Sequence, residues 1–168
     1  MSTLVRGGAV VQDPYRPLAD DEALPPSGAV LVDLARWQSS KSELKAGGRA
    51  VAVRIPNTVS AHALAVDLAD ADAVVLQFPS FADGRAYSQA RILRQEHAYP
   101  GEIRATGGAV VIDHFQSMRR CGIDAFELRA DQPVEPFLHP AGPFTIAYQP
   151  AADALPRVPD LRRAAWRR

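Results

Sequence analysis

Apolar and polar segments alternate regularly between residues 49 and 149. The apolar run of Val74, Val75, Leu76 and Phe78 is typical of a strand that is buried on both faces, and residues 50–55 are also mostly apolar. Between them, Ala61, Leu64 and Leu68 recur at helical spacing, which predicts a helix with one apolar face. The complete pattern predicts strands at residues 50–55, 73–78, 103–105, 125–128 and 144–148, and helices at residues 60–69, 84–95 and 108–120. Repeated strand-helix units imply an α/β fold with a mostly parallel sheet and right-handed crossovers.

The connections between successive strands are short, and each has room for one helix. This spacing fits a partial, half TIM-like barrel, and it also fits a small open sheet. The pattern of apolar positions does not separate the two arrangements. We favour the partial barrel.

Two terminal segments flank the alternating region, so the chain divides into residues 1–48, 49–149 and 150–168. The first segment is rich in Pro and Asp and predicts an extended arm packed on one face of the main domain. It contains short strands near residues 4–5 and 29–32 and a short helix that Gly47-Gly48 ends. The third segment is a basic tail with three prolines, and we expect it either to remain in solvent or to dock on a partner.

Composition and charge exclude several classes of partner. Lys and Arg together equal Asp and Glu at 19 each, so no global field attracts nucleic acid or a membrane surface. No apolar stretch approaches the roughly 18 residues that a membrane span needs, and the N-terminus lacks a signal pattern. We therefore expect a cytoplasmic protein with no membrane association.

No cofactor or metal site is evident in the motifs. Cys121 is the only cysteine, which excludes an intrachain disulfide and a zinc site built on paired cysteines. The four histidines have no spacing typical of metal ligands. The chain also lacks the Gly-x-Gly-x-x-Gly fingerprint and the phosphate-binding loop. Redox chemistry would therefore need a borrowed cofactor.

The most informative segment follows the strand at residues 73–78. Pro79 and Gly84 interrupt the apolar run there, which places Ser80, Asp83 and Arg85 at the carboxyl end of a parallel strand, where ligands and partners are commonly bound. Asp83 either caps the next helix or orients Arg85 toward an anion or an acidic partner.

Further arginines follow on the next predicted helix. Arg91 and Arg94 lie outside its apolar face, so they form either a solvated surface or a stripe that binds a partner.

Two weaker candidates follow later in the chain. After the strand at residues 103–105, which contains Arg104, the backbone amides of Thr106 and Gly107 could either bind an oxyanion or begin a helix. In the last turn of the helix at residues 108–120, Arg119 and Arg120 offset the helix dipole or bind a partner.

Cys121 follows that last turn directly. Nearby positive charge favours the thiolate of Cys121, whereas the carboxyl end of the helix opposes it, and a small buried residue is the alternative role. Asp83 and Cys121 are candidates for a catalytic role, although no catalytic residue can be assigned from the sequence.

Three blocks in order carry a resemblance to a known family: Phe78 to Arg85 continued by Ala90 to Arg94, then Gly101 to Gly107, then Met118 to Leu128. They resemble a bacterial family of unknown function, number 934 in the domain-of-unknown-function series. Two positions depart from the family pattern, Gly108 where Asp is more usual and His114 where Gln is usual.

The resemblance implies an association with assimilatory sulfite reduction, because members of this family are often labelled probable oxidoreductases of that pathway. The first hypothesis is an accessory protein that engages a reductase or its electron donor through an edge formed by Arg85, Arg91, Arg94 and Arg104. The alternative is an enzyme that acts on sulfite, sulfate or a related small oxyanion, with Arg85 and Arg104 as anion clamps. A third possibility is a scaffold whose arm and tail mediate homo-oligomer formation.

Overall fold

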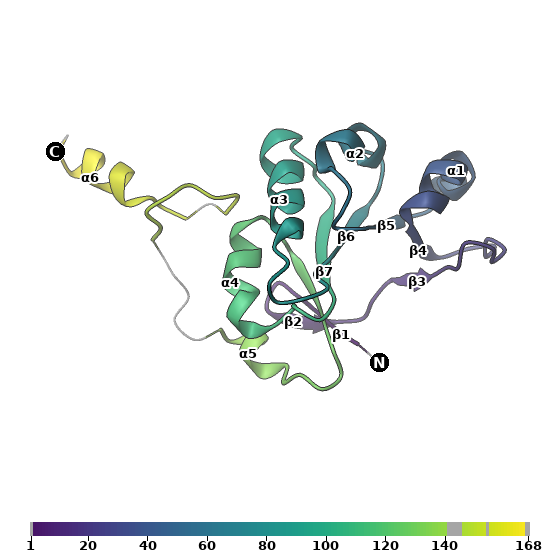
Figure 1. Ribbon diagram of the computed structural model, residues 1–168, viewed down its shortest axis with the longest axis horizontal. Coiled ribbons are helices and arrows are strands. Elements are labelled where there is room, and N and C mark those ends of the chain that lie inside the picture. The colour runs from purple at the N-terminus through teal and green to yellow at the C-terminus, as the bar shows by residue number, and fades with distance from the viewer. Residues whose placement is uncertain (1, 141–145, 154, 167–168) are drawn as a thin grey trace.

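The computed structural model describes residues 2–140, 146–153 and 155–166. In these residues one sheet of eight strands has the order β2-β1-β8-β7-β6-β5-β4-β3 and curls into a half barrel (Figure 1). The strands are β1 (Thr3–Arg6), β2 (Ala9–Val11), β3 (Tyr15–Pro17), β4 (Ala29–Asp33), β5 (Val51–Ile55), β6 (Ala73–Gln77), β7 (Glu102–Thr106) and β8 (Ala125–Leu128). Strands β3 to β8 run parallel, while β1 is antiparallel to both β8 and β2. The predicted α/β class, mostly parallel sheet and partial barrel are confirmed.

The first four helices in the described residues alternate with the central strands and lie along the outer side of the curled sheet, and two further helices follow β8 (Figure 1). In chain order, the helices are α1 (Leu34–Leu44), α2 (Ala61–Leu68), α3 (Arg85–Arg91), α4 (Ile112–Arg120), α5 (Glu135–Leu138) and α6 (Val158–Trp166). The continuation of α3 differs from the expected regular helix, because residues Ile92–Glu96 form a π-helical turn. Helix α4 begins four residues later than expected, because the amide of Ala109 donates to the carbonyl of Phe78 and the amide of Val110 to that of Gly107.

The main core lies between the helices and the outer face of the sheet. Val53, Leu76 and Ile103 from three neighbouring strands are fully buried there, and Leu68 and Leu93 meet them from the helical side. Apolar side chains at alternate strand positions and on one helix face remove their surface from water together, which is the main driving force for this arrangement. The helices therefore hold the central strands, and the loops at both strand ends, in fixed positions.

The inner face of the half barrel has a second, smaller cluster. Leu31, Ala52, Ala73 and Val75 are buried there, and Tyr15 packs against them. Strand register places Arg104 opposite Val75 on the same face. The inner face is therefore covered partly by apolar side chains and partly by a buried cation.

The N-terminal segment does not form a layer over one face of the domain. Strands β1 and β2 extend the sheet beside β8, and β3 and β4 extend it at the other edge beside β5. Val5, Val30 and Val32 are buried because they pack into the main core, and Leu4 is buried as well. The short connection at residues 12–14 thus joins the two edges of the sheet.

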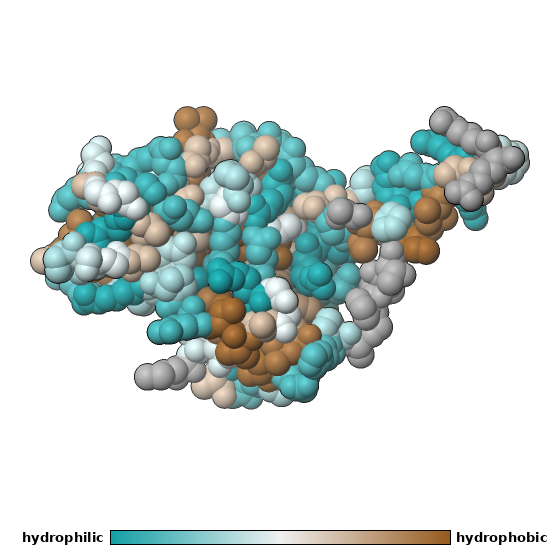
Figure 2. All heavy atoms as spheres, turned by 180° about the vertical axis from the view of Figure 1, so that it is seen from behind, coloured by the Kyte–Doolittle hydropathy of each residue, from teal (hydrophilic) through white to brown (hydrophobic). Residues whose placement is uncertain are grey.

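The C-terminal segment differs from the expected fifth strand of the alternating pattern. Residues 144 and 145 lie outside the described residues, and Ala147 makes only an isolated parallel bridge with Arg157. The tail then forms α6, none of whose residues is buried, and this helix stands away from the body (Figure 1). Figure 2 shows hydrophobic groups low on the body and on this tail, whereas most of that face is hydrophilic. None of the described helices is long and apolar enough to cross a membrane.

Candidate functional site

The loops at the carboxyl ends of β5, β6, β7 and β8 lie together at one edge of the half barrel. We call the part of this edge formed by Asn57, Phe81, Asp83, Arg85 and His114 the carboxyl-edge surface. Asn57 belongs to the loop after β5, Phe81 and Asp83 to the segment between β6 and α3, Arg85 is the first residue of α3, and His114 belongs to α4. Parallel strands bring these separate segments to the same end of the sheet.

Asp83 is the centre of a polar cluster on this surface. Its carboxylate accepts two hydrogen bonds from the Arg85 side chain, 2.9 Å from Nε and 2.6 Å from Nη2, and one from Nδ2 of Asn57 at 2.8 Å. The Arg85 guanidinium is the main cause that holds the pKa of Asp83 well below its ordinary value, and Asn57 adds to this effect. Asp83 therefore stays ionised and presents Arg85 in a fixed orientation rather than acting as a base.

An aromatic group lies beside this cluster. Phe81 is 67% exposed, yet its ring lies over the imidazole of His114 with a centroid distance of 4.2 Å. Nδ1 of His114 lies 3.1 Å from the carbonyl oxygen of Ala109, so Nδ1 carries the proton of this hydrogen bond. The ring of Tyr87 contacts the imidazole of His114 edge to face, and buried Phe78 in turn contacts Tyr87 edge to face. The result is an exposed aromatic side chain on a rigid support.

The loops after β6 and β7 are joined through Gly107. Its φ is +113°, and a Cβ atom there would lie 2.5 Å from the carbonyl oxygen of Phe78. That oxygen accepts a hydrogen bond from the amide of Ala109. Thr106 ends β7, and its carbonyl accepts from the amide of Phe78. Thr106 and Gly107 thus position the Phe81 loop by close backbone contact.

The loop after β8 completes the edge. Arg129 donates to the carbonyl of Gly108 at 2.6 Å and pairs with Asp131. The amide group of Gln132 donates to the carbonyl of Val110 at 2.8 Å. These contacts connect the β8 loop to the start of α4, and so to His114.

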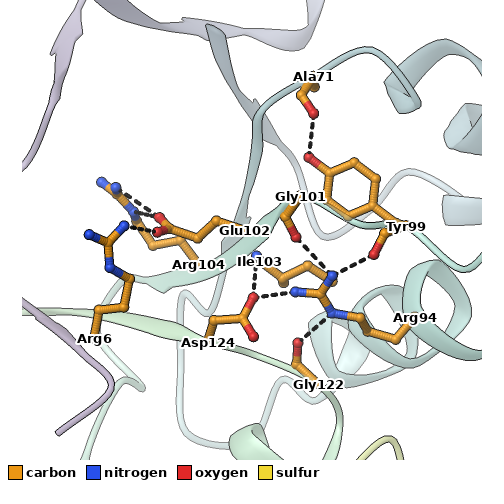
Figure 3. Close-up of polar contacts among 10 residues, drawn as sticks. All are labelled: Arg6, Ala71, Arg94, Tyr99, Gly101, Glu102, Ile103, Arg104, Gly122 and Asp124. Carbon is orange, nitrogen blue, oxygen red and sulfur yellow. Dashed lines mark hydrogen bonds and ion pairs between the residues drawn. The ribbon is translucent and has the colours of Figure 1, made fainter. Parts of the chain in front are cut away.

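Arg94 lies away from this surface and is fully engaged inside the molecule. It projects from the π-helical turn and donates to the carbonyls of Tyr99, Gly101 and Gly122, and it also pairs with Asp124 (Figure 3). The side chain holds together the segments before β7 and β8. Its guanidinium is therefore a structural clamp at the amino ends of these strands.

Arg104 also lies apart from Arg85. Its side chain is only 1% exposed on the inner face of the sheet, where it pairs with Asp13 at 2.7 Å and with Glu102 at 3.0 Å. The Glu102 carboxylate also accepts a hydrogen bond from the Arg6 side chain, as Figure 3 shows. The Arg104 guanidinium lies over the ring of Tyr15. Burial opposes the charged form of Arg104, but the two carboxylates more than offset this and raise its pKa. The expected continuous edge of Arg85, Arg91, Arg94 and Arg104 is therefore absent.

Three further predicted site residues, Arg91, Arg120 and Cys121, lie near the carboxyl end of α4. Arg91 is exposed and bonds only Gln95 among the described residues. Arg120 binds Asp153 and the carbonyl of Gln149 in the tail. Cys121 is half-buried, and burial raises the pKa of its thiol even though Arg91 and Arg120 oppose the shift. Cys121 therefore remains a thiol at the opposite end of α4 from Asp83.

The remaining polar groups of the carboxyl-edge surface form few contacts with one another. Ser80 is exposed, but among the described residues no histidine or carboxylate bonds its hydroxyl group. Within that part of the chain, no three His, Cys, Asp or Glu side chains are grouped to hold a metal ion. What the surface offers is an aromatic ring, an oriented guanidinium and fixed loops.

Sequence reasoning identified Asp83, Arg85 and Ser80 at this edge but missed Asn57, Phe81 and His114. Asn57 could have been found, because it follows a predicted strand at the same end of the sheet. Phe81 and His114 are 33 positions apart in the numbering, and no pattern in the sequence indicates their stacking.

Comparisons with known proteins give one positive result. No curated protein and no solved structure matches the chain. Residues 52–158, from the second residue of β5 to the first residue of α6, match the family described as "Bacterial protein of unknown function (DUF934)". This stretch contains the whole carboxyl-edge surface. The chain therefore belongs to this bacterial family of unknown function.

Proposed function

We propose that this protein is a cytoplasmic accessory protein of assimilatory sulfite reduction that binds a sulfite reductase or its electron donor through the carboxyl-edge surface. In this proposal the protein holds no cofactor of its own, and the partner performs the electron transfer. The pathway rests on the resemblance of the three sequence blocks. The mode of action rests on the geometry of the surface.

The observation that carries the proposed mode of action is the exposed Phe81 ring supported by His114. Aromatic and Arg side chains are enriched among the few residues that dominate protein interfaces. Arg85 belongs to the same surface with its side chain 57% exposed, and its Nη1 group makes no hydrogen bond to a described residue. An acidic or carbonyl-rich patch on a partner could accept from that group while covering Phe81.

The enzyme hypothesis has less support from the same residues. It assigned Arg85 and Arg104 to one anion clamp, but Arg104 is enclosed by Asp13 and Glu102 on the inner face. Asp83 is held as an ion by Arg85, and burial keeps Cys121 protonated. Binding to a partner protein requires none of these groups to react.

The test measures binding of the purified full-length protein to purified sulfite reductase holoenzyme by biolayer interferometry. Phe81→Ala should weaken binding by at least about tenfold, since residues at the centre of an interface commonly contribute more than 1.4 kcal/mol. Val66→Ala is the matched control, because Val66 is 86% exposed on α2, outside this surface. An affinity that Phe81→Ala leaves unchanged would remove this surface from the interface. Undetectable binding of the wild-type protein to both the reductase and its electron donor would reject the proposal.

A further inference from the structure

A pocket of about 570 Å³ lies at the opposite edge of the sheet from the carboxyl-edge surface. Its walls come from the Gly7-Gly8 turn after β1, the start of β8, the end of α4, and helix α5. Ala152 of the tail segment closes one side. This volume falls within the range of small-molecule sites, about 300–1,000 Å³.

Three phenylalanines form the apolar part of a pocket wall that also contains charged side chains and glycines. Phe115, Phe126 and Phe137 all line it, and each has at most 5% of its surface exposed. The ring of Phe115 meets Phe126 at 4.6 Å and Phe137 at 5.3 Å between centroids, in edge-to-face geometry. Because these rings belong to the main core, their positions are fixed without a ligand. A pre-formed apolar wall of this kind favours an aromatic or aliphatic group.

The carboxylates in the pocket wall are already neutralised. Asp124 pairs with Arg94 and also accepts from the amide of Ile103. Asp153 pairs with Arg120 at 3.1 Å. Neither acid therefore opposes an anionic ligand with an unpaired charge.

Two arginines at the pocket are less engaged. Arg119 in α4 is exposed and lies over the ring of Phe115, and it makes no hydrogen bond or ion pair within the described residues. Arg6 of β1 donates one nitrogen to Glu102, and its side chain is 49% exposed. The pocket therefore combines an apolar wall with an unpaired guanidinium.

We propose that this pocket binds a small organic anion that has an aromatic or aliphatic body and an oxyanion headgroup such as a carboxylate or a sulfonate. The body contacts the phenylalanine lining, and Arg119 forms charge-assisted hydrogen bonds with the headgroup. This site goes beyond the proposed partner binding, since it uses other residues at the other edge of the sheet.

Two dyes with the same aromatic body provide the test. 1-Anilinonaphthalene-8-sulfonate carries a sulfonate, and N-phenyl-1-naphthylamine lacks it. Fluorescence titration of the full-length protein should show saturable binding of the sulfonate, about tenfold tighter than binding of the neutral dye. Arg119→Gln should remove this preference and leave the neutral dye unchanged.

Arg91→Gln is the matched control, because Arg91 is an exposed arginine in the last turn of α3 and does not line the pocket. The location of the bound sulfonate is read from amide NMR shifts, with those of Gly7, Gly8 and Gly122 expected to move most. Equal affinity for the two dyes, a sulfonate affinity that Arg119→Gln leaves unchanged, or shifts outside these glycines would each overturn the proposal. All three measurements are independent of Phe81 and of any reductase.

Discussion

Arginine side chains illustrate how one residue type takes different roles in this fold. Arg104 is buried between Asp13 and Glu102, and Arg94 is surrounded by three carbonyl groups and Asp124. Arg85 is held by Asp83 at the surface. The number of arginines in a segment therefore says little about function, because the partner groups decide which guanidinium remains available.

The buried ion pairs of Arg104 lead to a stability prediction. Arg104→Met keeps most of the side-chain volume but leaves Asp13 and Glu102 without their central cation. Removing one partner of a buried ion pair is strongly destabilising, so we expect a loss of about 3 kcal/mol in the free energy of unfolding. Urea unfolding at neutral pH measures it. Arg91→Met, at an exposed position, should change the free energy by no more than about 0.5 kcal/mol.

The lowered pKa of Asp83 predicts a pH dependence. In the unfolded chain this carboxyl titrates near its ordinary value of 3.8, whereas in the folded protein Arg85 shifts the pKa downward. The folded state therefore gains stability from ionised Asp83 above about pH 4, and this gain is lost as the pH falls through the folded-state pKa. The difference in urea midpoint between wild type and Asp83→Asn should thus be larger at pH 7 than at pH 3. A difference that stays constant between these pH values would contradict the role of the Asp83–Arg85 pair.

The central element is the junction of the loops that follow β6 and β7. Gly107 allows the β7 loop to turn directly against the backbone of Phe78, and this contact sets the position of Phe81 and the start of α4. As a consequence, helix α4 begins only at Ile112. The geometry of the carboxyl-edge surface thus depends on a backbone contact rather than on a side-chain motif.

Replacing this glycine should disturb both stability and binding. Gly107→Ala combines a positive φ with a Cβ atom placed 2.5 Å from a backbone oxygen, which cannot move like the end of a flexible side chain. We expect a loss of at least about 3 kcal/mol on thermal unfolding, together with weaker partner binding. Gly47→Ala is the control, because Gly47 also has a positive φ but nothing lies within 4 Å of its Cβ position. Gly47→Ala should cost only about 1–2 kcal/mol, and equal losses for the two variants would contradict the contact.

Most of the alternating elements could be predicted from the sequence, because buried parallel strands and amphipathic helices have strong periodic patterns. The strand at residues 125–128 has the predicted bounds, and β5 and β6 differ from theirs by one residue. The π-helical turn and the late start of α4 could not be predicted, since they arise from contacts between distant segments. The stacking of Phe81 on His114 was missed for the same reason.

At the scale of the whole molecule, the N-terminal segment extends the half barrel at both edges. Its short strands carry too few residues for their pattern to reveal which neighbour they pair with, so the order β2-β1-β8 and β5-β4-β3 was not predictable. Asp13, in the connection between β2 and β3, pairs with Arg104 of β7 on the inner face. The edge strands and the central strands therefore belong to one continuous sheet.

Helix α6 stands away from this sheet (Figure 1). A chain that ends at Arg157 loses a helix with no buried residue, including Trp166, which is 91% exposed. We expect its free energy of unfolding to stay within about 1 kcal/mol of the wild-type value, because little apolar surface becomes newly exposed. Urea denaturation with matched m-values measures this. A larger loss would indicate that the tail packs on the body.

The most direct measurement of whether the carboxyl-edge surface serves sulfite reduction is growth of the native host with the chromosomal gene deleted or replaced. Cells with the Phe81→Ala protein should grow as slowly as the deletion strain on sulfate as the sole sulfur source, and both should recover on sulfide. Cells with Val66→Ala should grow like the wild type, with all variants present at equal levels. Wild-type growth of the Phe81→Ala strain on sulfate, while the deletion strain fails, would contradict the assigned surface. Wild-type growth of the deletion strain itself would contradict the pathway.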